Sequence, residues 1–169
     1  MTDDLRCDDC IAIGALHCAK CEWAVVPDIW IPTKIGIGVI VRREGRVLMG
    51  KRKGLRGNGE WWFAGGKPEP GEWPVAAARR ELFEETGLVA TRVEKMPIWT
   101  YDLFPDGVSF ITIYFEARVP KGEPENKEPR KCEGWQWVDP YDPPTPNFGS
   151  SMEVFEVIQA TPPFVLGRT

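Results

Sequence analysis

Three glutamates, Glu81, Glu84 and Glu85, are spaced so that one helix would carry them on a single face. Successive helical residues advance by roughly 100°, so positions i, i+3 and i+4 share an arc of about 100°. Clustered carboxylates repel one another unless a cation neutralises them, and their oxygens suit hard ions such as Mg²⁺ or Mn²⁺. The spacing therefore makes these glutamates candidate ligands of a magnesium ion, which could activate a bound water.

The residues around the glutamates mark the limits of this helix. Pro74 suits the first turn, where its missing N–H costs nothing, and Gly87 suits the left-handed position after the last turn. We expect a helix from about Trp73 to Thr86. The apolar stripe that would dock this helix on a sheet consists of Val75, Ala78 and Leu82.

The loop before the helix extends the pattern. Gly65 and Gly66 let the backbone curl back toward the acids, so a carbonyl oxygen of this turn is a further candidate ligand. An isolated Glu-x-x-Glu-Glu is usually only a solvated acidic face. Here, however, fixed positions run from Gly66 to Leu88 in the order Gly, five residues, Glu, seven residues, Arg-Glu-aliphatic, one residue, Glu-Glu, one residue, Gly-aliphatic. A match of this length favours the functional interpretation.

This interval resembles the Nudix box. The resemblance implies an α/β fold, in which a mixed sheet lies between helices as an α/β/α sandwich, and hydrolysis of a nucleoside diphosphate linked to a further group. It also implies that Glu81, Glu84 and Glu85 bind the metal and that one of them can serve as base. Arg80 would orient these carboxylates, and Glu72 would assist from the loop.

Two flanking segments, residues 48–66 and 125–138, are similar to those of MutT-like nucleoside triphosphate diphosphatases. The similarity covers about residues 34–156 and is closest to the branch that acts on ordinary, oxidised or thiopurine nucleoside triphosphates. Ala64 replaces a proline that is common before the paired glycines, which concerns the local loop geometry more than the chemistry.

The sequence defines the substrate contacts less sharply. Arg52 is a candidate for the phosphates, because guanidinium groups pair bidentately with phosphoryl oxygens, but a solvated basic strand end is an equal alternative. Glu128 is either a further metal ligand or an ordinary loop charge. Phe63, Thr112 and Phe148 align by resemblance with the walls of a base pocket, where aromatic faces would stack on a nucleobase, and Phe63 also suits core packing.

Four of the five cysteines form two pairs with the spacing of metal knuckles, Cys7-x-x-Cys10 and Cys18-x-x-Cys21. Four thiolates suit a closed tetrahedral Zn²⁺ site. A segment this small cannot form an adequate hydrophobic core and would need a bound metal ion to stabilise it. Free thiols or disulfides are the alternative, and His17 is a substitute ligand. We expect a structural zinc-binding segment at residues 1–30 and a Nudix hydrolase domain at residues 31–169.

Composition limits the remaining classes of protein. The chain has 169 residues, of which 43% are hydrophobic and 27% charged, as in one compact enzyme domain with a small attachment. A net charge of −4 argues against a polynucleotide partner, and no apolar run approaches the roughly 18 residues needed to span a bilayer. We expect a cytoplasmic protein that binds a small nucleotide, with monomer and homodimer both open.

The segments around the box alternate between strand-like and turn-like composition. A second helix is expected at residues 151–159. Strands are expected at residues 35–42, 47–53, 91–102, 108–119 and 134–138.

Three functions compete. The preferred one is Mg²⁺-dependent cleavage of a nucleoside triphosphate, a dNTP or a modified NTP, to nucleoside monophosphate and diphosphate. The second is hydrolysis of NADH, ADP-ribose or another nucleoside diphosphate derivative: the cysteine-rich start resembles zinc-bearing NADH diphosphatases, although their aromatic-proline signature after the box is missing. The third is a noncatalytic nucleotide-sensing adaptor, which should have lost a box glutamate, and this chain has lost none.

Overall fold

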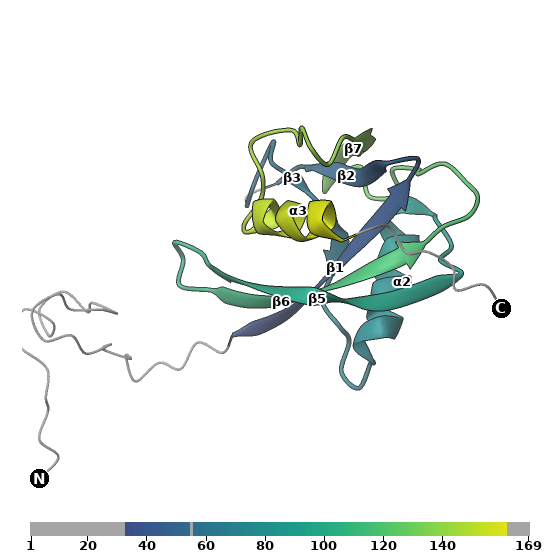
Figure 1. Cartoon of the computed structure of the whole chain (residues 1–169). Helices are drawn as coiled ribbons and strands as arrows, with labels where there is room; N and C mark the ends of the chain where they lie inside the picture. Colours follow the sequence, from purple (N-terminus) through teal and green to yellow (C-terminus); the bar gives the residue numbers. More distant parts are fainter. Residues whose placement is uncertain (1–32, 55, 162–169) are drawn as a thin grey trace, which may run out of the picture. The chain divides into compact units, whose positions relative to one another are not determined.

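The computed structural model describes residues 33–54 and 56–161, so the predicted zinc segment and the domain boundary near residue 30 lie outside the described residues. The described part contains a seven-stranded sheet flanked by two helices (Figure 1). None of its helices is long and apolar enough to cross a bilayer. The helices are α2 (Pro74–Thr86) and α3 (Ser151–Ala160), and the strands are β1 (Lys34–Arg43), β2 (Arg46–Arg52), β3 (Trp61–Trp62), β4 (Ala64–Gly66), β5 (Arg92–Leu103), β6 (Ser109–Arg118) and β7 (Cys132–Val138).

The sheet is mixed, as expected. Its main order is β3-β2-β1-β6-β5, with β4 paired to β1 and β7 paired to β2. Only β1 and β6 run parallel, and the other named pairs are antiparallel. Strand β1 pairs with β2 only beside their hairpin and then with β4, where Ile37 lies opposite Gly66 and Val39 opposite Ala64. This change of the pairing partner of β1 from β2 to β4 brings the glycine turn before α2 to the middle of the sheet.

Each face of the sheet packs against one helix, which confirms the predicted α/β/α sandwich. Alternate residues of β1 point to opposite faces, as the two-residue period of a strand requires. On one face Ile37 and Val39 join Leu82 of α2 in a buried cluster. On the other face Ile40 joins Phe155 of α3 in a second cluster.

Helix α2 begins and ends where the sequence predicts. Pro74 occupies the first helical position after an extended Trp73, and Gly87 has a φ of 70° and donates its N–H to the Phe83 carbonyl. The predicted apolar stripe is wrong at Val75, which is 40% exposed. Burial starts only at Ala77, so the first turn stays outside the buried face, which consists of Ala77, Ala78, Leu82, Glu85 and Thr86.

The difference between Val75 and Leu82 is testable by truncation. Leu82 is fully buried, so Leu82→Ala should lower the free energy of unfolding by about 2–5 kcal/mol, through lost burial and the cavity left behind. Val75→Ala is the matched control on the same helix and should change it by less than about 0.5 kcal/mol. Urea unfolding followed by tryptophan fluorescence measures both. Equal losses in the two variants would contradict the observed docking of α2.

Candidate functional site

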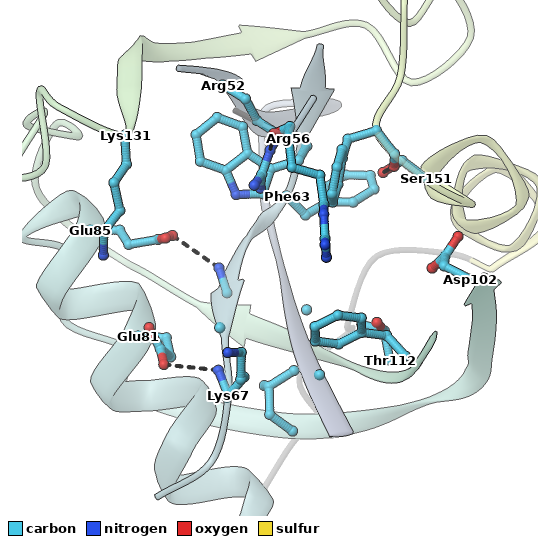
Figure 2. Close-up of a pocket in the computed structure, with 18 of the residues that line it drawn as sticks. Arg52, Arg56, Phe63, Lys67, Glu81, Glu85, Asp102, Thr112, Lys131 and Ser151 are labelled. Atoms are coloured by element: carbon cyan, nitrogen blue, oxygen red, sulfur yellow. Dashed lines mark hydrogen bonds between the residues drawn. The ribbon is translucent and has the colours of Figure 1, made fainter. Parts of the chain in front are cut away.

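A cavity of about 710 Å³ lies over the sheet and receives side chains from both helices (Figure 2). Glutamates of α2 line one end, and residues of β5 and α3 line the other end. Nine residues singled out in the sequence contribute to its walls: Arg52, Phe63, Gly65, Gly66, Arg80, Glu81, Glu85, Thr112 and Phe148. The other predicted residues of the described part, Glu72, Glu84 and Glu128, do not line it.

Glu85 is the buried acid of the site, with 8% of its surface exposed. Its carboxylate accepts a hydrogen bond of 2.9 Å from the Gly65 amide at the start of the glycine turn. Burial raises the pKa of Glu85 to about 8, and the nearby charges of Glu81 and Glu128 act in the same direction. Without a cation, this position therefore favours a protonated, neutral carboxyl group.

The glycine turn also holds Glu81. The Lys67 amide donates a hydrogen bond of 3.2 Å to Glu81 Oε1, drawn in Figure 2 together with the bond to Glu85. A Cβ atom on Gly66 would lie 2.3 Å from the same oxygen, far inside contact distance. Only glycine therefore permits this approach of the helix carboxylate to the loop.

Arg80 connects the acids of α2 with the preceding loop. Its Nε and Nη2 atoms donate to both carboxylate oxygens of Glu72, at 3.0 and 2.9 Å. Its Nη1 atom lies 2.9 Å from Glu81 and 3.0 Å from Glu84. The hydrogen bonds from Arg80 lower the pKa of Glu72, and those bonds raise the pKa of Arg80. Glu84 is 53% exposed and turned toward Arg80, which accounts for its place outside the cavity.

Glu128 pairs with a lysine that faces the acids. The Lys131 ammonium lies 2.7 Å from Glu128 Oε1 and also lines the cavity beside Glu85 (Figure 2). The hydrogen bond to Glu128 raises the pKa of Lys131 first, and the charges of Glu85 and Glu81 raise it further. Lys131 therefore supplies positive charge to the carboxylate group of the site.

The donor atoms fit a hard divalent cation. The site offers carboxylate oxygens on the half-buried Glu81 and the buried Glu85, and the pKa of Glu85 is raised first by burial and then by the negative charges of Glu81 and Glu128. Among residues 33–54 and 56–161, no three His, Cys, Asp or Glu side chains already converge into a closed cage. The arrangement suits Mg²⁺, which uses few protein ligands and keeps several waters.

Aromatic rings and guanidinium groups stack along the upper wall of the cavity in Figure 2. The Arg52 guanidinium lies 3.9 Å from the ring centre of Phe148 and 5.2 Å from that of Trp62. Phe148 in turn stacks on Phe104, whose ring carries Arg56 at 4.6 Å. Arg52 is therefore held between rings, and is not the freely solvated strand end that was the alternative.

Phe63 has a second role in the core. It is 4% exposed and contacts Phe155 at a ring separation of 5.3 Å and Tyr114 at 6.3 Å. Burial raises the pKa of Tyr114 to about 12, so its hydroxyl stays protonated. Phe63 thus joins the α3 cluster to the cavity wall.

The sequence interpretation missed several polar residues of the cavity, among them Lys67, Lys131, Asp102 and Ser151. Strand β5 carries a signal that points to Asp102. Thr100 is 1% exposed and Asp102 is half-buried, whereas Tyr101 between them is 51% exposed. The usual alternation of strands is thus reversed, with polar residues inward, and a strand that buries polar residues needs partners for them.

Comparison with known proteins supports this geometry. The model of the NUDIX domain matches residues 32–155. The oxidized purine nucleoside triphosphate hydrolase of Danio rerio is 37% identical over 101 residues, covering 60% of this chain and 63% of that protein. An RNA pyrophosphohydrolase of Bartonella bacilliformis is 27% identical over 134 residues, covering 64% of this chain and 79% of that protein.

A solved structure shows the same fold. The MutT NUDIX hydrolase of Burkholderia pseudomallei superposes with a TM-score of 0.71 at 27% identity, covering 75% of this chain and 98% of that one. The family model spans more than half of the chain and includes the whole glutamate-bearing helix with the glycine turn before it. The chain therefore belongs to the NUDIX family and has the fold of a MutT-like NUDIX protein.

Proposed function

We propose that the chain hydrolyses a nucleoside triphosphate, with Mg²⁺, to nucleoside monophosphate and diphosphate. The observation that carries this proposal is a cavity with acids of α2 at one end, polar residues of β5 and α3 at the other, and cationic and aromatic side chains in its walls. A nucleotide has the same order of parts. Its anhydride would lie against α2, and its base would lie against β5 and the start of α3.

The cationic side chains of the cavity are the proposed binding groups for the phosphates. Arg52, Arg56, Lys67 and Lys131 all line the cavity. Guanidinium groups bind phosphoryl oxygens in a bidentate manner, while lysine acts as a point charge. Because Arg52 is held between two rings, its orientation is set before a substrate arrives, which reduces the entropy lost on binding.

The carboxylates are proposed to hold the metal. Glu81 and Glu85 line the cavity, and Glu84, Glu128 and the Gly66 carbonyl are the further predicted ligands. When bound, Mg²⁺ would neutralise the phosphates and make a coordinated water more acidic. Arg80 and Glu72 act as positioning residues, because their paired hydrogen bonds fix the loop and the helix relative to each other. One of the glutamates would accept the proton of the attacking water.

The relatives support a nucleotide substrate and leave its kind open. The Danio rerio protein is named for oxidised purine nucleoside triphosphates, and the Bartonella protein for RNA. The match to the Danio rerio protein covers 63% of that protein's length, so we transfer its activity to this chain only as a proposal. Because side chains of β5 and α3 line the end of the cavity away from the acids, we infer that the base of a single nucleotide would lie there, and we prefer triphosphates to NADH or RNA.

Product analysis tests this proposal directly. Each of the four dNTPs, incubated with the protein and Mg²⁺, should give monophosphate and diphosphate without orthophosphate, because attack on the α–β anhydride leaves the terminal pair intact. Chromatography with product standards measures this. NADH, ADP-ribose and 5′-triphosphorylated RNA serve as competing substrates. Efficient cleavage of one of these with all dNTPs inert would overturn the triphosphate assignment.

Glu85→Gln should separate function from stability. Loss of a ligand charge should lower kcat by about 100-fold or more, as is usual for preorganised electrostatic groups. In metal-free protein the same change should be stabilising at pH 8. The pKa of Glu85 is about 8 in the folded protein and 4.5 in the unfolded chain. The neutral carboxyl group of Glu85 therefore makes its full contribution to the free energy of unfolding below pH 4.5, and this contribution is lost as the pH rises through 8.

Unfolding in urea with a chelator at pH 5, 6.5 and 8 measures this stability difference. The gain of Glu85→Gln over the wild type should be smallest at pH 5 and largest at pH 8, since glutamine can still accept the Gly65 hydrogen bond. Glu84→Gln is the matched control, because its side chain is 53% exposed and its loss should change stability little. Parallel stability curves for wild type and Glu85→Gln would refute the buried-acid interpretation.

From the sequence alone we also propose that Cys7, Cys10, Cys18 and Cys21 hold one structural Zn²⁺. Thiolates suit zinc and carboxylates suit magnesium, so the two metals should partition by ligand softness. Protein purified without added metal should contain about one zinc per chain, and the four bound thiolates should be protected from alkylation. Elemental analysis and native alkylation measure this, and zinc well below one atom per chain with all four thiols reactive would exclude the site.

A further inference from the structure

The end of the cavity opposite α2 is lined by two polar side chains, Asp102 of β5 and Ser151 at the start of α3, which we call the end wall. Figure 2 shows both on the side away from Glu81 and Glu85. Neither residue takes part in the phosphate chemistry described above. Their hydrogen bonds determine what the end wall can offer to a ligand.

Asp102 uses one of its oxygens for the protein and keeps the other for the cavity. Its Oδ1 atom accepts hydrogen bonds of 2.8 Å from both the amide and the hydroxyl of Ser150. Its Oδ2 atom receives only a long contact of 3.5 Å from the Thr100 hydroxyl. Since a carboxylate oxygen has two lone pairs, Oδ2 retains acceptor capacity.

Ser151 also presents an acceptor. Its hydroxyl donates a short hydrogen bond of 2.6 Å to the Phe148 carbonyl, and the residue is 4% exposed. The single hydroxyl proton is therefore engaged inside the protein, and only lone pairs remain for a ligand. The end wall consequently consists of acceptors alone.

The backbone is shaped around this carboxylate. Gly149 has a φ of +54°, and a Cβ atom on it would lie 2.8 Å from Asp102 Oδ1 and 3.3 Å from Oδ2. Glycine thus lets the chain before α3 close over Asp102. Asp102 thus lines the cavity with a carboxylate whose second oxygen is available to accept hydrogen bonds from a ligand.

We propose that the end wall selects a guanine-type base, which rests on the nucleotide function proposed above. Guanine presents two adjacent donors, N1–H and the 2-amino group, along one edge, which matches two acceptors. Adenine has an acceptor at N1, and thymine and uracil have carbonyl oxygens on both sides of their single donor. These bases would therefore place hydrogen-bond acceptors against the acceptors of the end wall. A buried polar group without a partner is the usual source of strong discrimination between similar substrates.

The test compares guanine and adenine substrates in the full-length protein. Wild type should show a kcat/KM for dGTP at least about 10-fold above that for dATP. Asp102→Asn keeps the shape and the acceptor for Ser150 but turns Oδ2 into an amide donor, so the dGTP-to-dATP ratio should fall by about 10-fold. Ser151→Ala removes the second acceptor and should lower the same ratio. Asp139→Asn, a loop aspartate outside the cavity that also accepts a backbone amide, is the matched control and should leave the ratio unchanged.

Calorimetric binding of dGMP and dAMP without Mg²⁺ separates this inference from the proposed function. One outcome is that no triphosphate is cleaved, while dGMP binds more tightly than dAMP to the wild type but not to Asp102→Asn. In that case the proposed hydrolysis of triphosphates is wrong, and the proposed selection of guanine by the end wall is supported. A wild-type protein without guanine preference in either assay overturns the end wall. Equal losses for dGTP and dATP in Asp102→Asn and Ser151→Ala also overturn it, because a purely structural role lowers both substrates alike.

Discussion

The site depends on bringing acids of α2 against the sheet without paying the full cost of burying their charge. Two glycines make the approach geometrically feasible. A Cβ atom on Gly65 would lie 2.0 Å from the Ile37 carbonyl of β1, and one on Gly66 would lie 2.3 Å from Glu81. The amide of Gly65 then supplies the hydrogen bond that holds Glu85. A larger residue at either position would separate helix, turn and strand.

The charge of the acids is balanced by groups that lie beside them. Arg80 reaches three glutamates, and Lys131 faces Glu85 from the opposite segment. These cations do not cancel the burial of Glu85, whose pKa remains raised. Because Glu85 is buried beside other acids, this group of carboxylates favours binding of a cation.

The sequence predicted those parts of the fold that depend on local chemistry. The limits of α2 followed from Pro74 and Gly87, because a missing N–H and a left-handed φ are requirements of single positions. Strands β3 and β4 were not predicted, since they have two and three residues and exist only through pairing with β2 and β1. Val75 was misjudged because the angle at which a helix docks is a property of its partner surface.

The same distinction holds for the site. The glutamates of α2 lie within five residues of one another, so their common face could be derived from helical geometry alone. Asp102 and Ser151 are far apart in sequence and meet only because β5 ends beside the start of α3. No spacing rule connects them. The polar inward positions of β5 were visible in the sequence, but their partners were not.

The separation of the two ends of the cavity has a consequence for how such enzymes diversify. The acids lie on α2, whereas the end wall belongs to β5 and α3, and no residue serves both. If the proposed roles hold, a substitution at position 102, 149 or 151 would change recognition of the base without touching the acids of α2. Recognition and catalysis could then vary independently of each other.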